Sequence, residues 1–257
     1  MDKLLEKQIV VNDLLINYYF LPGSPKEVPL VFLHGWNSES RFWFKSISKL
    51  AGKQNIFFFD LPGFGKSQKP KKPFGLNDYT QILISAFKKI GIKKAILTGH
   101  SFGGAIALSM AVNNPNSIEK LILVASSGIR PQTIKKKTVR AIARLVHPLF
   151  VHKSMQGIRK NIYKKLKADD YLNTSGVMRK TYRRIINHDV TSVLKKIKHK
   201  TLIIWGERDE ETPLEDAKVF KDNISDSEMV VLSAAGHFCF VDNPDKFISE
   251  VERFVKV

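Results

Sequence analysis

A serine within a glycine-rich pentapeptide is the first residue of this sequence that could do chemistry. Residues 99–103 read Gly-His-Ser-Phe-Gly, which has the form G-x-S-x-G. Such a short pattern also occurs by chance, so its meaning depends on its context. Here it follows the apolar run 95–98 and precedes the helical pattern 105–112. This order of strand, sharp turn and helix exposes a nucleophilic serine, and we predict that Ser101 is a nucleophile.

The turn around Ser101 must let neighbouring backbone segments approach closely, which requires residues with no side chain. Gly99, Gly103 and Gly104 meet this requirement. The alternative interpretation is a plain glycine-rich turn that leads into a helix. The presence of a matching base and acid elsewhere in the chain favours the catalytic interpretation.

A serine hydroxyl becomes an effective nucleophile only when a base accepts its proton. His237 follows Gly236, shortly after the apolar run 229–232 and before the last helical pattern, which is the expected place for that base. Any of the seven histidines could instead be an ordinary core or surface residue. Those in or beside a basic segment, without a comparable setting, are His147, His152, His188 and His199. His34 belongs to a different loop, and the turn should point His100 away from the serine.

An acid is needed to orient the imidazole and to stabilise its charged form. Asp209 ends the segment 206–209, which comes straight after the apolar run 201–205. Nucleophile, acid and base thus follow one another in one of the chain orders known for such a set of three residues. Glu207 and Glu210 are alternatives with less suitable spacing from the strand. The end of the preceding strand, another place for such an acid, holds only serines at 126–127.

Cleavage of an acyl bond also requires hydrogen-bond donors for the negative oxygen that develops. One predicted donor is the backbone N–H of Phe102, directly after the nucleophile. The other is the backbone N–H of Trp36, in the loop 34–37 that follows the apolar run 29–33. A tight turn without this role is the alternative for the loop.

The elements that must position these residues are short apolar runs alternating with helical patterns, as in βα units around a mostly parallel sheet. Residues 9–11 and 14–20 flank Asn-Asp and predict a leading hairpin. Further strands are expected at residues 29–33, 56–59, 95–98, 121–124, 201–205 and 229–232. Helices are expected at residues 40–50, 77–90, 102–113, 213–221 and 245–255. Candidate helix starts or caps are Asn77, Ser101 and Thr212.

Residues 128–195 interrupt this alternation and contain no convincing strand. Apolar residues recur at helical spacing within 139–146, 155–166 and 177–186. The pattern predicts a cap or lid of three or four amphipathic helices inserted between two strands of the sheet. The sheet domain would then consist of residues 1–127 and 196–257.

The net charge of +18 is concentrated in the same region, because residues 128–200 contain 20 Lys and Arg but only three acidic residues. A solvated basic outer face is the simpler interpretation. Attraction of anionic substrates or of anionic lipid is the alternative. Nucleic-acid binding is not expected, since the basic residues are not interleaved with exposed aromatic platforms.

Composition limits the remaining possibilities. The single cysteine, Cys239, cannot form an internal disulfide or a thiolate metal cluster, and we expect no metal site. No apolar run approaches the roughly 18 residues that a membrane-spanning helix needs. The first residues mix charged and apolar side chains and do not resemble a secretory signal. We therefore expect a cytoplasmic protein that acts on a small molecule.

Together these motifs resemble the α/β-hydrolase superfamily over nearly the whole chain. The matching segments are residues 34–36, 60–67, 99–104, 206–209 and 236–237. Within the superfamily, the chain is most similar to small bacterial carboxylesterases and to meta-cleavage-product hydrolases, which break carbon–carbon bonds. The resemblance implies a cofactor-free serine hydrolase with an eight-stranded sheet and a helical cap. Haloalkane dehalogenases and epoxide hydrolases have Asp at the position of Ser101 and are disfavoured.

Two further acidic residues are expected to act through loop structure. Asp60 ends a strand before the glycine-rich loop 61–67, and bracing that loop is a more natural role than catalysis. The loop is not a phosphate-binding loop, because it lacks the G-x-x-x-x-G-K-[ST] spacing. Asp242 stands where many relatives have Glu, and we expect it to affect loop packing more than chemistry.

Three functions remain open at this stage. The leading hypothesis is a carboxylic-ester hydrolase that forms an acyl-enzyme on Ser101. The second is a carbon–carbon bond hydrolase with the same three residues, which polar or arginine side chains for a substrate carboxylate would favour. The third is a small-molecule receptor that keeps the hydrolase fold, since a fold does not determine a function.

Overall fold

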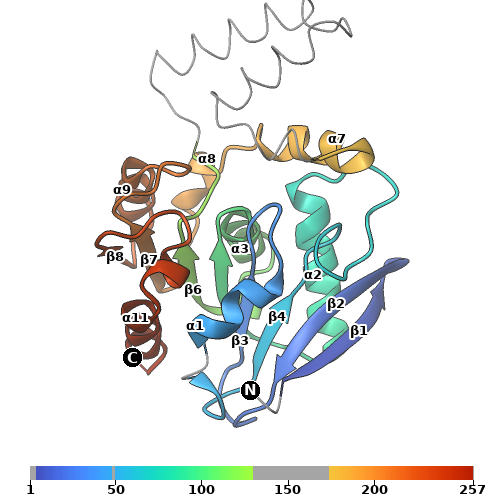
Figure 1. The fold of residues 1–257 in the computed structure, drawn as a ribbon, viewed down its shortest axis with the longest axis horizontal. Helices are drawn as coiled ribbons and strands as arrows, with labels where there is room; N and C mark the ends of the chain where they lie inside the picture. Colours follow the sequence, from blue (N-terminus) through green and yellow to red (C-terminus); the bar gives the residue numbers. More distant parts are fainter. Residues whose placement is uncertain (1–3, 48–49, 130–173, 257) are drawn as a thin grey trace, which may run out of the picture.

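A single sheet organises the computed structural model, which describes residues 4–47, 50–129 and 174–256. Within these ranges the sheet has eight strands in the order β1-β2-β4-β3-β5-β6-β7-β8 (Figure 1). β2 pairs antiparallel with β1 and with β4, and all other neighbours pair parallel. The predicted fold class, a mostly parallel eight-stranded sheet flanked by helices, is confirmed.

Every predicted strand is present. The strands are β1 (Leu5–Val11), β2 (Leu14–Leu21), β3 (Leu30–Leu33), β4 (Ile56–Phe59), β5 (Ala95–His100), β6 (Ile118–Val124), β7 (Thr201–Gly206) and β8 (Ser227–Leu232). All residues of β3, β5 and β7 are buried. Strands covered on both faces are apolar throughout, which explains why the sequence shows them as uninterrupted apolar runs. β1 is an edge strand with mostly exposed residues, and its beginning was therefore missed.

The leading hairpin is also confirmed. Val11 pairs with Leu14 across a two-residue turn. Asn12 and Asp13 have φ values of 47° and 61°. Both central residues of the tight hairpin turn that suits the twist of paired strands need positive φ, and Asn and Asp tolerate it better than most residues.

Helices cover both faces of the sheet. The described helices are η1 (Ser40–Trp43), α1 (Phe44–Ile47), α2 (Leu76–Ile90), α3 (Phe102–Asn113), η3 (Pro115–Ser117), α7 (Gly176–Ile185), α8 (Thr191–Leu194), α9 (Leu214–Asn223), α10 (Cys239–Asp242) and α11 (Pro244–Lys256). α2, α3 and α9 pack on one face, and α1, α10 and α11 pack on the other. The predicted helix at 40–50 is divided into η1 and α1, and α10 was not predicted.

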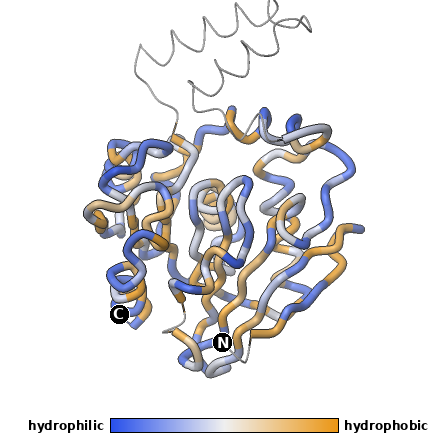
Figure 2. Tube along the Cα trace, in the orientation of Figure 1, coloured by the Kyte–Doolittle hydropathy of each residue, from blue (hydrophilic) through white to orange (hydrophobic). Residues whose placement is uncertain are grey.

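The sheet separates two hydrophobic cores, and alternate residues of each central strand enter opposite cores. In β7, for example, Ile203 and Trp205 face the core with α2, α3 and α9, whereas Leu202 and Ile204 face the other core. Figure 2 shows hydrophobic residues gathered along these central strands. Burial of this much apolar surface on both faces makes the sheet a firm base for the loops at its ends.

Two of the three predicted helix starts are wrong. α2 begins at Leu76 rather than Asn77, because the Asp78 carboxylate accepts a hydrogen bond from the Gly75 N–H at 2.7 Å and fixes the first turn. α9 begins at Leu214, and the side chain of Thr212 bonds elsewhere. Ser101 does precede α3, but its side chain makes no capping hydrogen bond.

The predicted helical insertion begins after β6 and ends before β7, which are neighbours in the sheet. Its expected helical patterns at 139–146 and 155–166 lie outside the described residues. The third pattern, at 177–186, corresponds to α7. Among the helices that the structure describes, none has the length and apolar character needed to cross a membrane.

Candidate active site

Ser101 occupies a sharp turn between β5 and α3. Its φ and ψ are 50° and −114°, a combination that non-glycine residues adopt only when the surrounding structure imposes it. Two backbone hydrogen bonds hold the turn: the Ser101 N–H donates to the Val124 carbonyl and the Ser127 N–H donates to the Ser101 carbonyl, each at 3.0 Å. The strain is thus maintained by the neighbouring end of β6.

Glycines beside the serine are required by close backbone contacts. A Cβ atom on Gly99 would overlap the backbone of Gly103, and one on Gly103 would overlap the backbone of Leu33 at the end of β3. A side chain at either position would push α3 away from the strands that it covers. The sequence requirement for small residues therefore has a direct steric cause.

His237 and Asp209 form a buried hydrogen-bonded pair. His237 Nδ1 lies 2.9 Å from Asp209 Oδ2, and the two residues are 9% and 6% exposed. The other carboxylate oxygen, Oδ1, accepts the N–H groups of Glu211 and Thr212, both at 2.9 Å. Burial alone would raise the pKa of Asp209, but hydrogen bonds and charge from His237, with hydrogen bonds from Thr212, outweigh it and lower the pKa. The carboxylate therefore stays ionised and fixes the imidazole.

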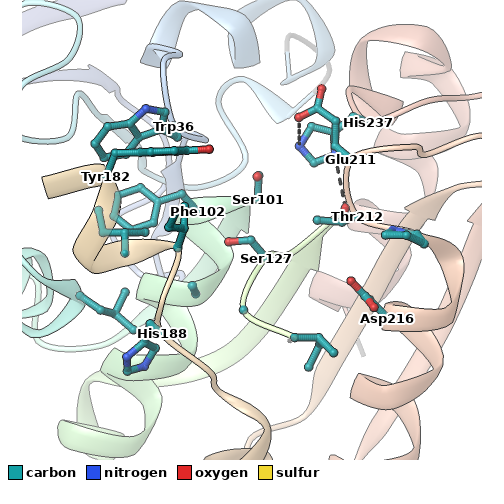
Figure 3. A pocket seen from close by; sticks show the side chains of 17 residues that line it. Trp36, Ser101, Phe102, Ser127, Tyr182, His188, Glu211, Thr212, Asp216 and His237 are labelled. Atoms are coloured by element: carbon teal, nitrogen blue, oxygen red, sulfur yellow. Dashed lines mark hydrogen bonds and ion pairs between the residues drawn. The ribbon is translucent and has the colours of Figure 1, made fainter. Parts of the chain in front are cut away.

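Ser101 and His237 line the same cavity, whose volume is about 270 Å³ (Figure 3). Within the described part of the chain, no hydrogen bond joins the Ser101 hydroxyl to the imidazole. His237 Nε2 lies 3.5 Å from Glu211 Oε2 instead. The structure thus brings Ser101, His237 and Asp209 to one site without a hydrogen bond between Ser101 and His237. Catalytic hydrogen bonds are often long before substrate binds.

The two predicted backbone donors border this cavity as well. Phe102 is the first residue of α3, so its N–H has no acceptor within the helix. The loop after β3 packs against Ser101, since a Cβ on Gly35 would lie 3.3 Å from Ser101 Cβ. The ring centroids of Trp36 and Phe102 are 5.7 Å apart. The structure thus places both residues beside Ser101.

Asp60 braces the loops behind this wall of the site. The side chain is 1% exposed and accepts hydrogen bonds from Asn17 Nδ2 at 3.0 Å, from the Ser40 N–H at 2.9 Å and hydroxyl at 2.6 Å, and from the Lys66 N–H at 3.0 Å. It ties β2 to the start of η1, which follows the loop that carries Trp36, and to the loop after β4. These contacts agree with the predicted bracing role.

His100 is a residue whose contribution the sequence did not reveal. Its Nε2 lies 2.9 Å from the His237 carbonyl oxygen, and the two imidazole centroids are 4.7 Å apart. Because a carbonyl can only accept, the proton of His100 is on Nε2. Burial, followed by the charge of His237, lowers the pKa of His100 to about 3. A neutral, buried imidazole therefore supports the backbone of His237. The two residues are 137 positions apart, and only the fold reveals their contact.

The other acidic candidates have structural contacts. Glu207 Oε2 accepts the Ala234 N–H at 2.9 Å on the outside of the loop. Asp242 Oδ2 accepts the Gly236 N–H at 2.8 Å, directly before His237, which agrees with the predicted effect on loop packing. Asp209 is thus the acid whose carboxylate is hydrogen-bonded to His237 Nδ1. Within the ranges described, no group of three or more His, Cys, Asp or Glu residues is arranged to hold a metal ion.

The amino-acid sequence is similar to known proteins over most of its length. Residues 28–244 match the family model described as alpha/beta hydrolase fold. The chain is 28% identical over 261 residues to the uncharacterized hydrolase YugF of Bacillus subtilis, covering 93% of this chain and 94% of that protein. It is 27% identical over 257 residues to a pimeloyl-[acyl-carrier protein] methyl ester esterase of Pectobacterium atrosepticum, covering 93% and 98%.

Solved structures agree at the level of the fold. A membrane phospholipase A described as a bacterial virulence factor superposes with a TM-score of 0.78 at 21% identity, over 99% of this chain and 86% of that one. A meta-cleavage product hydrolase from Pseudomonas fluorescens IP01 superposes with a TM-score of 0.74 at 18% identity, over 97% of each chain. With the family match covering most of the sequence, these findings show that the chain is a hydrolase of the alpha/beta hydrolase fold family.

Proposed function

We propose that this hydrolase is a serine esterase that cleaves a carboxylic ester of a small, partly hydrophobic substrate through an acyl-enzyme on Ser101. The observation that carries the proposal is the convergence on one cavity of a serine in a strained turn and an imidazole held by a buried carboxylate. Relatives named as methyl ester esterases add support.

In the proposed reaction, Ser101 Oγ attacks the acyl carbon while His237 Nε2 accepts the hydroxyl proton. The backbone N–H groups of Trp36 and Phe102 stabilise the negative oxygen of the tetrahedral intermediate. The ester C–O bond then breaks, and His237 returns its proton to the leaving alcohol. Asp209 stays ionised and holds the imidazole in the tautomer with Nε2 free to accept. Water, deprotonated by the same imidazole, finally releases the acid and regenerates the serine.

We also propose that residues 128–195 form a cap over this cavity. Support comes from α7, since Tyr182 and Ile185 line the same cavity as Ser101. α7 is fixed to the loop before α2, because the Phe74 N–H donates to Thr181 Oγ1 at 3.0 Å. A side chain of α7, Met178, is buried against Gly63. The cap boundaries and the cytoplasmic location stay predictions.

The charged side chains in the cavity favour an ester over a carbon–carbon substrate. Cleavage of a ring-fission product requires groups that bind the substrate carboxylate. Among the described residues that line the cavity, none is Arg or Lys, and Glu211 and Asp216 are acidic. Carboxylates would repel such an anion.

The test is hydrolysis of p-nitrophenyl acetate, butyrate and octanoate by the wild type and by Ser101→Ala. We expect turnover that the substitution lowers by at least about 10³-fold, because the nucleophile is removed. The chain-length profile would measure the usable length of the acyl pocket. Turnover that survives in Ser101→Ala, or no turnover in the wild type, would contradict the proposed function.

A further inference from the structure

An acidic side chain lies at the catalytic end of the cavity. Glu211 Oε2 is 3.5 Å from His237 Nε2, and its side chain is 59% exposed (Figure 3). The Glu211 N–H donates to Asp209 Oδ1 at 2.9 Å. The carboxylate that holds the imidazole therefore also fixes the backbone of Glu211. A negative charge is thus placed beside the one imidazole nitrogen that faces the cavity.

Among the described residues that line the cavity, no lysine or arginine balances the negative charge of Glu211. Besides His237, the other titratable residues of the described cavity wall are Tyr182, His188 and Asp216. These three take part in further interactions, so only Glu211 is considered as a source of unbalanced charge. The local charge is therefore opposite in sign to the net charge of +18 carried by the whole chain.

We propose that Glu211 is a specificity-determining residue that favours esters with a positively charged alcohol part and disfavours those with a negatively charged one. The inference rests on the proposed function, because His237 Nε2 is the atom that returns a proton to the leaving alcohol. The alcohol oxygen then lies beside the Glu211 carboxylate, and a substituent on the alcohol lies somewhat farther from it.

The size of the effect follows from Coulomb's law. A charge on the alcohol about 6–8 Å from the carboxylate, with an effective dielectric constant of about 40, changes the rate constant roughly five- to tenfold. Because the Glu211 side chain is more than half exposed, mobile ions reach it and added salt should weaken the preference.

Butyrylcholine and 3,3-dimethylbutyl butyrate are a suitable pair of probes. They have the same acyl group and nearly the same shape, and differ in a quaternary nitrogen that replaces a carbon. The ratio of their kcat/KM values cancels effects on the imidazole that both esters share. We would measure this ratio in the wild type, in Glu211→Gln and in Glu211→Lys. The matched control is Glu215→Gln, which removes the same charge from an exposed position of α9 outside the cavity wall.

We expect the wild type to prefer the choline ester, with a ratio that falls about fivefold or more in Glu211→Gln and further in Glu211→Lys. The ratio in Glu215→Gln should stay within about twofold of the wild-type value, since an exposed distant charge is screened. A ratio that Glu211→Gln leaves unchanged, or that Glu215→Gln lowers equally, overturns the proposal.

A binding measurement separates this inference from the proposed function. Calorimetric titration of the two esters into Ser101→Ala gives a ratio of Kd values that needs no turnover. Loss of the preference for butyrylcholine in the Ser101→Ala, Glu211→Gln double variant supports the role of Glu211 even if neither ester is hydrolysed by the wild type. Equal Kd values for the two esters in Ser101→Ala overturn it, whatever the activity assay shows.

Discussion

Thr212 and His237 share one oxygen atom of Asp209. The Thr212 hydroxyl donates to Asp209 Oδ2 at 2.7 Å, and His237 Nδ1 lies 2.9 Å from the same atom. The Trp205 indole N–H donates to the Thr212 carbonyl at 2.7 Å, which fixes the backbone of that threonine. Trp205, a buried residue of β7, thus fixes Thr212, and Thr212 in turn restrains the rotation of the Asp209 carboxylate.

Replacing Thr212 by valine should lower kcat/KM for a neutral ester by about tenfold to a hundredfold. The substitution keeps the shape of the side chain and removes a hydrogen bond to a charged acceptor, worth about 1.5–3 kcal/mol. Thr212→Ser retains the hydroxyl and should recover most of the activity. Equal losses in the two variants would assign the effect to packing and not to the hydrogen bond.

Asp209→Asn should lower kcat by about 10⁴-fold, because an amide presents an N–H to the imidazole and favours the wrong tautomer. Asp242→Asn is a matched control, since its oxygen can still accept the Gly236 N–H. The control should lose less than about tenfold, the effect of weakening one exposed hydrogen bond. Single-turnover acylation rates would measure both. A mild defect in Asp209→Asn would argue against the proposed role of this acid.

The free energy of unfolding should decrease as the pH is lowered, and part of this decrease should come from His100. Its pKa is lowered from 6.5 to about 3 in the folded protein. The unfolded chain therefore binds a proton below pH 6.5 that the folded chain does not bind, and stability is lost as the pH falls through this window. Full loss of this contribution amounts to roughly 3–5 kcal/mol.

His100→Gln can keep the hydrogen bond to the His237 carbonyl while removing the titration. Urea unfolding between pH 7 and pH 4 should therefore show a smaller decrease in stability for this variant than for the wild type. Parallel pH dependences for the two proteins would contradict a buried neutral imidazole at this position.

Gly103→Ala should lower the free energy of unfolding by about 1–3 kcal/mol, because the added methyl group overlaps the backbone at the end of β3. Gly75→Ala is the control: its nearest non-local atom would lie 3.7 Å from the new Cβ, at the carboxylate of Asp78. The control should cost less than about 1 kcal/mol. Chemical denaturation of both variants would compare the two costs.

The sheet could be predicted from the sequence because burial on both faces demands continuous apolar segments. The run Ile56–Phe59 was found with its observed ends. Strand ends that lack apolar side chains could not be predicted in this way. β5 continues through Gly99 and His100, whose pairing with β6 depends on a neighbour and not on their own side chains.

Side-chain contacts within and between loops could not be predicted. Thr212 was expected to begin a helix, since threonine is a common capping residue. Its hydroxyl bonds to Asp209 instead. Glu211 and His100 carried no signal, because each depends on where the loop containing His237 lies in space. Ser101, Asp209 and His237 could be expected near one end of the sheet, because each residue closely follows β5, β7 or β8. Their catalytic roles stay predictions.

The adjacency of β6 and β7 has a consequence for how this protein could change over time. Leu121 pairs with Thr201, so the two strands join although the whole stretch from Ala125 to Lys200 separates them. Doubling the length of such a connection costs only about 0.6 kcal/mol in closure entropy. The stability of the sheet therefore depends only weakly on the length of the stretch between β6 and β7. New substrate preferences could be acquired there by insertion or replacement, while the strands that carry the serine and the acid keep their register.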